Sequence, residues 1–326
     1  MARLLDAHNP QHLQQAVDAL ADGRLVAFPT ETVYGLGADA GSDVAVGRVF
    51  EAKGRPADHP LIVHVPNVEC AYELASALPP VAQKLIEAFW PGPLTVIVPR
   101  RPGVAGAAAG GQDTIGLRCP AHPVATSLLE ACAQRGILGL AAPSANLFGR
   151  ISPTTAAHVA EEFGDDVLVL DGGACEVGIE STIVDCSRDR PVLLRPGLLT
   201  RGEIEAAIDE PLLERDAEAP RASGTLEAHY APRAKLRLMS ADILQTALQV
   251  LGENLPKLAL YSRTVRAPRG MLHRRMPDDA AKAAHELFAV LRELDAQGVS
   301  LIWVESPPSA PEWDGVRDRL VRAAAA

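Results

Sequence analysis

Aromatic residues and cysteines are scarce in this sequence. The 326 residues include only 6 Phe, 4 Tyr and 3 Trp, although 48% of the chain is hydrophobic. A core must therefore be built from Ala, Val, Leu and Ile, and the apolar fraction excludes a disordered protein. The five cysteines are odd in number and dispersed, and no C-x-x-C pair occurs. This pattern supports neither a zinc ribbon nor a disulfide framework, so we expect reduced thiols in a cytoplasmic protein.

Long apolar segments are missing as well. The longest stretch without Asp, Glu, Lys or Arg covers 14 residues, 136–149, whereas a helix that crosses a bilayer needs about 20 apolar residues. The opening segment MARLLDAHNP has no apolar signal core. We expect no membrane association.

Positive charge is in deficit over most of the chain. The net charge is −10, with 15 basic and 24 acidic residues in positions 1–208, which argues against wholesale neutralisation of nucleic-acid phosphates. Residues 233–275 hold nine basic residues against two acidic ones. A solvated face explains this local excess better than a nucleic-acid patch, although the patch stays an alternative.

Several nucleotide and hydrolase motifs are absent. The chain has no G-x-x-x-x-G-K-[ST] loop, no H-E-x-x-H and no G-x-S-x-G, and the glycines of 35–41 have the wrong spacing for a dinucleotide fingerprint. These absences weigh against a P-loop kinase, a dehydrogenase and an α/β-hydrolase.

The alternation of short β-branched or Leu-rich runs with helical patterns predicts an α/β protein. In the first 208 residues the predicted strands are 24–28, 61–65, 94–98, 115–118, 137–142, 167–170, 181–185 and 192–195. The predicted helices there are 10–22, 44–53, 79–90, 123–134, 154–163 and 201–208.

A charged, Ala- and Pro-rich stretch follows residue 208 and predicts a linker. Beyond it, strands at 235–239, 257–262 and 299–305 alternate with helices at 241–251, 278–297 and 312–322. We therefore expect a large α/β domain over 1–208, a linker over 209–234 and a small parallel-sheet domain over 235–326.

Polar clusters follow or precede the predicted strands. In open α/β sheets ligands bind beyond the carboxyl ends of strands, so these clusters are candidate binding elements. Each also has an ordinary structural explanation, as a polar turn or a helix cap. The clusters are P-T-E-T-V-Y-G-L-G (29–37), K-G-R-P (53–56), P-S-A-N (143–146) with S-P-T (152–154), and E-S-T-I-V-D (180–185).

Two arginines, Arg118 and Arg195, end predicted strands. An arginine in such a position can bind a carboxylate or phosphate through two parallel hydrogen bonds, although a surface ion pair is the usual role of a single one. His64 lies within a predicted strand, where a structural histidine is the common outcome. Together the clusters and cations predict a nucleotide or phosphate site without a metal-ligand cage.

The same motifs resemble the Sua5/YrdC/YciO family, in particular its two-domain Sua5 form. The resemblance runs in order through P-T-E-T-V-Y-G-L-G (29–37), K-G-R-P (53–56), H-P-L-I-V-H-V (59–65), F-W-P-G-P-L-T (89–95), T-I-G-L-R (114–118), A-P-S-A-N (142–146), E-S-T-I-V-D (180–185), L-R-P-G (194–197) and H-Y-A-P (229–232). It implies a catalytic domain over 1–208, with a YrdC-like twisted mixed open sheet and flanking helices. A linker over 209–234 would form a lid over the active site, and a smaller Rossmann-like α/β domain would follow over 235–326.

The resemblance also implies a reaction. L-Threonine, bicarbonate and ATP would give L-threonylcarbamoyl-AMP and pyrophosphate, the first step of the N6-threonylcarbamoyladenosine modification of tRNA beside the anticodon. Mg²⁺ would accompany ATP as its counter-ion. A separate threonylcarbamoyl transferase would use the product, direct contact with tRNA stays open, and we expect a monomer.

By the same resemblance, individual residues acquire expected roles. The threonine pocket would consist of Thr32, His64, Arg118, Ala142 and Ser181, with Arg118 on the carboxylate. ATP would be surrounded by Lys53, Arg55, His59, Thr114, Ser144, Asn146, Ser152 and Arg195, and Tyr230 would close over it as part of a lid. The residues expected to act on the reacting groups are Lys53, Arg55, Ser144 and Asn146.

Three other functions remain open on the sequence. The first is an RNA-binding module of the YrdC fold without catalysis. The second is a carbamoyl-transfer domain of the hydrogenase-maturation type, and the third is a non-catalytic scaffold.

Overall fold

The computed structural model describes residues 3–164, 167–251 and 257–326, and it divides into two compact units. Unit 1 comprises residues 1–148 and 152–225, and unit 2 comprises 149–151 and 226–326. The first two residues of the expected catalytic domain, and Glu253 of the basic stretch, lie outside the described residues. No helix in the described part of the chain is long and apolar enough to cross a membrane.

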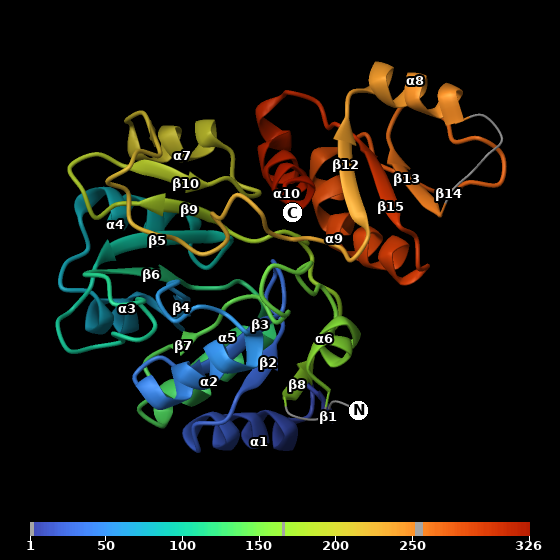
Figure 1. Ribbon diagram of the computed structural model, residues 1–326. Coiled ribbons are helices and arrows are strands. Elements are labelled where there is room, and N and C mark those ends of the chain that lie inside the picture. The colour runs from blue at the N-terminus through green and yellow to red at the C-terminus, as the bar shows by residue number, and fades with distance from the viewer. Residues whose placement is uncertain (1–2, 165–166, 252–256) are drawn as a thin grey trace. The chain divides into compact units, whose positions relative to one another are not determined.

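Unit 1 is built on a mixed sheet (Figure 1). In the described part of the chain the sheet has 11 strands. Their order is β1 (Arg3–Asp6), β8 (Leu168–Asp171), β2 (Val26–Phe28), β3 (Gly35–Asp39), β7 (Leu140–Ala141), β4 (Ile62–His64), β6 (Thr114–Arg118), β5 (Leu94–Pro99), β9 (Thr182–Asp185), β10 (Val192–Arg195) and β11 (Leu213–Glu214).

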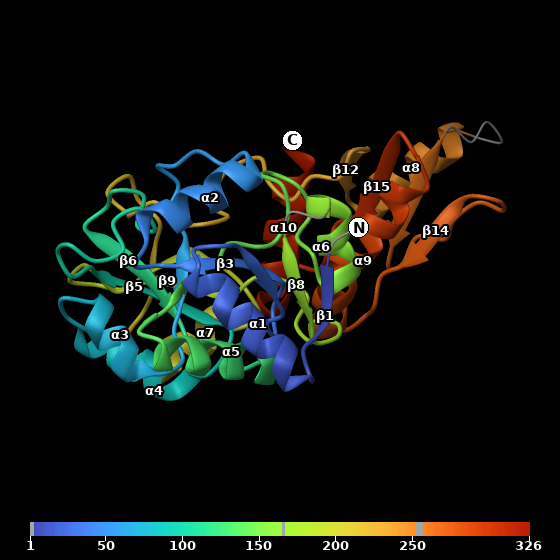
Figure 2. The same ribbon diagram turned by 90° about the horizontal axis from the view of Figure 1, so that it is seen from below.

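The helices of unit 1 pack on two apolar layers. One layer joins α1 (Pro10–Ala21) and α5 (Pro123–Gln134), which lie side by side (Figure 2), to side chains of β2, β7 and β8. The larger layer takes its helical side chains from α2 (Asp43–Lys53), α3 (Val68–Leu74), α4 (Pro80–Phe89), α6 (Ala156–Phe163) and α7 (Arg201–Ile208).

Unit 2 is a three-layer α/β structure. Its described residues form a four-stranded parallel sheet in the order β12 (Lys235–Met239), β15 (Leu301–Glu305), β13 (Leu258–Ser262) and β14 (Leu272–Arg275). On one face Leu244 and Leu248 of α8 (Ala241–Leu251) pack on Leu260. On the other, Tyr261 donates a hydrogen bond to Glu286 of α9 (Ala280–Ala296) at 3.0 Å. A short 3₁₀ helix (Pro311–Trp313) leads into α10 (Asp314–Ala324), which packs on α9 and β12.

The expected fold class is confirmed: a large mixed sheet with flanking helices precedes a smaller sheet domain. The helix predicted over 44–53 is observed as α2, and both end at Lys53. Ser42 accepts a hydrogen bond from the backbone of Ala45 at its start, and Gly54 has a φ of 61° at its end, a left-handed conformation that glycine adopts without strain.

The sequence pattern missed β1, β3, α3, β11 and β14. Strand β3 was hidden because GLGAD lacks the β-branched residues typical of strands. Its glycines allow close packing, since a Cβ on Gly37 would lie 2.8 Å from Cε1 of Phe28. Strand β14 was hidden because LHRR shows no alternation of apolar and polar residues.

The stretch expected to be a linker is divided between the units. Residues 209–225 belong to unit 1, where β11 pairs with β10. Residues 226–234 belong to unit 2.

Candidate active site

The candidate site of unit 1 lies on one face of the sheet. Side chains alternate between the two faces of a strand. Val63, Ile115, Leu117 and Val96 therefore point into the larger apolar core. Their neighbours occupy the opposite face, namely Ile62 and His64 of β4, Thr114, Gly116 and Arg118 of β6, and Thr95 and Ile97 of β5.

This placement differs from the expectation that ligand residues gather at one carboxyl edge. Strands β4 and β6 are parallel, with His64 opposite Arg118. Strand β4 is antiparallel to β7, so the P-S-A-N segment after β7 and the carboxyl end of β4 lie at opposite edges. The residues share a face because of strand register, which a sequence pattern does not reveal.

The P-T-E-T turn after β2 is fixed by Thr30. Its hydroxyl accepts hydrogen bonds from the backbone N–H groups of Thr32 and Val33, both at 3.2 Å, and donates to the carbonyl of Val33 at 2.7 Å. Val177 donates from its backbone N–H to the carbonyl of Glu31 at 2.7 Å and braces the turn from outside. The turn therefore presents Glu31 and Thr32 in a fixed conformation.

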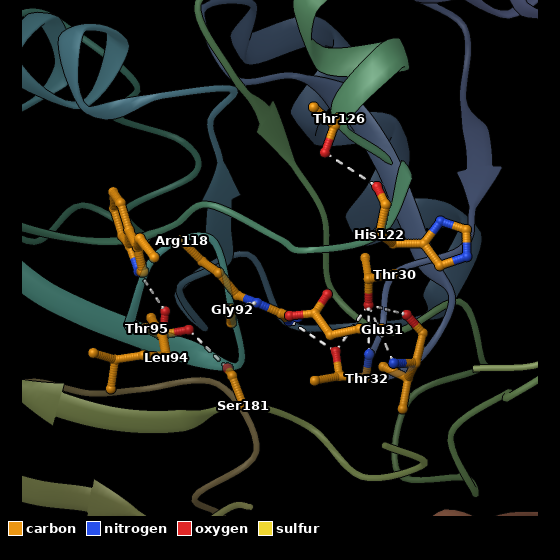
Figure 3. A network of polar contacts seen from close by, with 12 residues as sticks. Thr30, Glu31, Thr32, Gly92, Leu94, Thr95, Arg118, His122, Thr126 and Ser181 are labelled. Atoms are coloured by element: carbon orange, nitrogen blue, oxygen red, sulfur yellow. Dashed lines mark hydrogen bonds and ion pairs between the residues drawn. The ribbon is translucent and has the colours of Figure 1, made fainter. Parts of the chain in front are cut away.

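Arg118 is the centre of a buried polar network (Figure 3). Its Nη2 lies 2.7 Å from Oε1 of Glu31, and its Nη1 donates to Oγ1 of Thr32 at 2.8 Å. Its Nε donates to the carbonyl of Gly92 at 3.3 Å. Only 4% of the Arg118 side chain and 8% of the Glu31 side chain are exposed, so solvent screens this pair weakly.

Ser181 links Thr95 to Arg195. Its hydroxyl lies 2.8 Å from the hydroxyl of Thr95, an interaction drawn in Figure 3. Arg195 donates from Nε and Nη2 to the carbonyl of Ser181 at 3.1 and 2.9 Å, and its Nη1 donates to the carbonyl of Ser223 at 3.0 Å.

His64 is buried beside Arg118 and is uncharged. Burial, followed by the nearby positive charge of Arg118, lowers the pKa of its imidazole to about 3. The expected pocket residue Ala142 lies close by, because its backbone N–H donates to the carbonyl of Ile62 at 2.9 Å.

Lys53 positions the P-S-A-N segment. It is the last residue of α2, and its buried ammonium donates to the carbonyls of Ser144, at 2.7 Å, and Asn146. Burial and the nearby Arg55 hold the pKa of Lys53 well below its usual value. Elsewhere in unit 1, Ser152 donates to the buried carboxylate of Glu180.

Arg55 connects K-G-R-P to the segment that follows β11. Its Nη2 donates to the carbonyl of Pro60 at 3.0 Å and to the hydroxyl of Ser223 at 3.4 Å. The Phe148 ring lies beneath its guanidinium, 5.6 Å away, and also contacts His59, with ring centroids 5.5 Å apart. Burial and Arg55 lower the pKa of His59.

The segment 221–225 covers part of the same face. Arg221 pairs with Asp58 at 2.7 Å, and its backbone N–H donates to the side chain of Gln112 at 2.8 Å. A small cavity beneath the segment is lined by Thr114, Gly116, Thr95, Ala222 and Ser223, among others.

The arrangement brings most of the expected residues together. Four buried cations, Lys53, Arg55, Arg118 and Arg195, stand with two buried carboxylates, Glu31 and Glu180. The excess of positive charge suits a polyanionic ligand. Tyr230 belongs instead to unit 2, where its ring packs on Phe288, with centroids 5.5 Å apart, and beneath the guanidinium of Arg319.

Sequence reasoning did not single out Glu31, Thr95, Glu180 or Ser223. Glu31 could have been noticed as the one acid within a hydroxyl-rich turn, and Thr95 as a hydroxyl inside the apolar strand LTVIVP. Ser223 lies in the stretch 209–234 expected to form the lid, but its contacts with Arg55 and Arg195 depend on tertiary structure.

Two family models match the chain in tandem. The first, Sua5_yciO_yrdC, is described as "Telomere recombination" and matches residues 18–197. The second is described as "Threonylcarbamoyl-AMP synthase, C-terminal domain" and matches residues 199–325.

Curated relatives match over nearly the whole chain. The threonylcarbamoyl-AMP synthase of Pyrococcus abyssi is 39% identical over 320 residues, which cover 94% of this chain and 92% of the relative. That of Bacillus subtilis is 37% identical over 335 residues, covering 98% and 94%.

Solved structures of P. abyssi Sua5 share the complete fold. The crystal structure of that protein with L-threonine has a TM-score of 0.89 at 36% identity, covering 99% of this chain and 97% of that one. A variant in which an adjacent histidine and tyrosine are replaced by alanine also has a TM-score of 0.89, at 35% identity, covering 99% and 96%. In the present sequence the dipeptide His-Tyr occurs once, at 229–230.

Proposed function

The chain belongs to the Sua5/YrdC/YciO family in its two-domain, Sua5-type form, and from this premise we propose how unit 1 carries out the threonylcarbamoyl-AMP synthase reaction. L-Threonine, bicarbonate and ATP give L-threonylcarbamoyl-AMP, pyrophosphate and water. The enzyme is thus a nucleotidyltransferase that acts in tRNA modification, with ATP as a substrate. The RNA-binding alternative is not favoured, because relatives that match nearly the whole chain are named as synthases.

The buried guanidinium of Arg118 is the observation that carries the assignment of the threonine site. Its bonds to Glu31, Thr32 and Gly92 fix its orientation, and such a preorganised arginine can bind the carboxylate of an amino acid. We assign the remainder of the pocket to Thr32, which accepts a hydrogen bond from Arg118, to His64, which lies opposite Arg118 in the neighbouring strand, and to Ala142 and Ser181. Because His64 is neutral, it contributes hydrogen bonds and shape rather than charge.

ATP binds, in this proposal, on the neighbouring cationic part of the face. Arg55 and Arg195 bind phosphate oxygens, and both already turn toward Ser223 of the covering segment. Thr114, His59, Ser144, Asn146 and Ser152 supply further hydrogen bonds to the nucleotide. Lys53 acts on the reacting groups through the segment that it holds, because its own donors reach the carbonyls of Ser144 and Asn146.

The chemistry requires no nucleophile from the protein. The ammonium group of threonine first loses a proton to water. The resulting amine nitrogen bonds to the carbon of bicarbonate, hydroxide from bicarbonate leaves as water with a second proton from that nitrogen, and N-carboxythreonine forms. One oxygen of its new carboxylate then bonds to the α-phosphorus, while the bond from that phosphorus to the bridging oxygen breaks and pyrophosphate departs. Fixed positions for both substrates and neutralisation of the phosphates account for such a step.

Magnesium accompanies ATP in this mechanism and neutralises phosphate charge. No group of three or more His, Cys, Asp or Glu side chains within the described ranges could hold a metal ion. As part of this proposal, the phosphate oxygens of ATP bind the cation.

Segment 221–225 serves as the cover of the reacting groups. It lies over Thr114 and is held by Arg55, Arg195 and its own Arg221. A cover of this kind protects a mixed anhydride from water. We assign Tyr230 to the same cover. In this proposal its ring leaves its contacts with Phe288 and Arg319 and contacts the nucleotide.

The remaining proposals concern the localisation, oligomeric state and partners of the enzyme. We propose a cytoplasmic monomer whose product is consumed by a separate threonylcarbamoyl transferase. Direct contact with tRNA is compatible with this scheme, but it is not required for the first step.

The proposed function is tested by pyrophosphate release from ATP, with threonine and bicarbonate omitted in turn. Release should require both. Arg118→Ala should reduce it by at least about 100-fold, because it removes a buried charged hydrogen-bonding group worth roughly 3 kcal/mol.

Arg135→Ala is the matched control. Arg135 forms an ion pair with Asp18 at 3.0 Å, but half of each side chain is exposed, so release should remain at the wild-type rate. Release without threonine, or full activity in Arg118→Ala, would refute the assignment of the threonine site.

A further inference from the structure

The hydrogen-bond donors of Arg118 are only partly used. Of its five N–H groups, one on Nε donates to Gly92, one on Nη1 to Thr32, and one on Nη2 faces Oε1 of Glu31. One N–H group remains on each terminal nitrogen. An incoming carboxylate can take these two groups without displacing Glu31.

Glu31 also keeps an unused atom. The residue is 6% exposed, and neither of its buried carboxylate oxygens has a hydrogen-bond partner among the described residues. Oε1 lies in the ion pair with Nη2 of Arg118, whereas no ion pair in the part of the chain that the structure describes involves Oε2. A buried carboxylate oxygen without a partner is costly, and fold stability alone does not require it, because the turn is already fixed by Thr30. Figure 3 shows the carboxylate of Glu31 beside the guanidinium of Arg118, next to Thr32.

We propose that Glu31 binds the ammonium group of the amino-acid substrate and thereby selects α-amino acids over α-hydroxy acids. This inference rests on the proposed function, in which Arg118 binds the carboxylate. An α-amino acid carries a negative carboxylate and a positive ammonium group on the same carbon. A guanidinium and a carboxylate 2.7 Å apart match those two charges, and the substrate ammonium supplies the donor that Oε2 lacks.

Neither of the two histidines near the Glu31–Arg118 pair competes for this role. His64 is neutral, and burial lowers the pKa of the buried His122, so that histidine is also neutral near pH 7. Arg118 is therefore the only cation that the described residues place in contact with Glu31, and it engages Oε1 rather than Oε2.

The experiment compares two ligands by calorimetric titration of the full chain. One is L-threonine; the other is the 2,3-dihydroxybutanoate of the same configuration, in which a hydroxyl replaces the ammonium. Wild-type protein should bind threonine more tightly. Glu31→Gln should lose roughly 10- to 100-fold in threonine affinity, as expected for a charged hydrogen bond, and should bind the hydroxy acid at least as well as wild type.

Controls separate this role from a purely structural one. Glu73→Gln removes a carboxylate that pairs with Arg101 at 3.1 Å on the surface and should change neither affinity. Glu31→Asp keeps the charge and should retain a preference for threonine. This variant also covers the case in which Glu31→Gln does not fold.

Three results would overturn the inference. Equal loss of both affinities in Glu31→Gln would mean that Glu31 only positions Arg118. Unchanged affinities in that variant, or a folded Glu31→Asp without preference, would exclude an ammonium contact. Failure of the proposed function is distinguishable, because Arg118→Ala would then still bind threonine like wild type.

Discussion

His64 should make the stability of the protein depend on pH. The residue is 3% exposed and lies opposite Arg118 in neighbouring parallel strands. Its pKa falls from the ordinary 6.5 to about 3, through burial first and the charge of Arg118 second. The perturbation is His64→Asn, which keeps a polar side chain of similar size and removes the titration.

The sign and size of the effect follow from proton linkage. Between about pH 6.5 and pH 3 the unfolded chain carries a proton on His64 and the folded chain does not. The unfolded state binds more protons in this window, so stability falls as the pH falls. At about pH 5, some 1.5 units below the unfolded pKa, the loss due to His64 is about 2 kcal/mol, at about 1.4 kcal/mol per unit.

The assay is urea unfolding of both proteins near pH 7.5 and near pH 5, followed by circular dichroism. Wild type should lose about 2 kcal/mol more than His64→Asn on acidification. Other groups, including His122, titrate in both proteins and cancel in the difference. Equal losses in the two proteins would refute the argument, because His64 would then be protonated at pH 5 in the folded state too.

Three further predictions concern the site and its cover. Lys53→Met should lower pyrophosphate release on the order of 100-fold, because the carbonyls of Ser144 and Asn146 lose a charged donor. The control is Lys84→Met, which removes a hydrogen bond to the carbonyl of Ile208 at a distant position and should leave release unchanged. Gly197→Ala should lower the free energy of unfolding by about 1–3 kcal/mol in urea melts, because its Cβ would lie 2.5 Å from the backbone nitrogen of Thr182; Gly202→Ala, with open space around it, should not destabilise the protein. Arg221→Ala should raise the KM for ATP in steady-state assays without a large change in stability, because its pairing with Asp58 is exposed.

Local chemistry was sufficient to predict many elements. Helix α2 follows from its helical pattern and from Gly54 after its last residue, which is left-handed in the structure. Strands β5 and β10 are apolar runs that no turn residue interrupts. The strand GLGAD could not be predicted in this way, because its stability comes from β2 and β7 on either side and from the Phe28 ring over Gly37.

By itself, the sequence determined the class of the fold, the polar segments and the family, because the motifs lie in order along the chain. Which side chains meet was decided by the tertiary structure. Glu31 and Arg118 are 87 positions apart in the sequence, and Arg195 and Ser223 are 28 apart. The pairing of distant strands, and the path by which the segment after β11 folds back over the sheet, bring these residues into contact. Such contacts depend on pairing between distant strands, and local propensity carries no information about them.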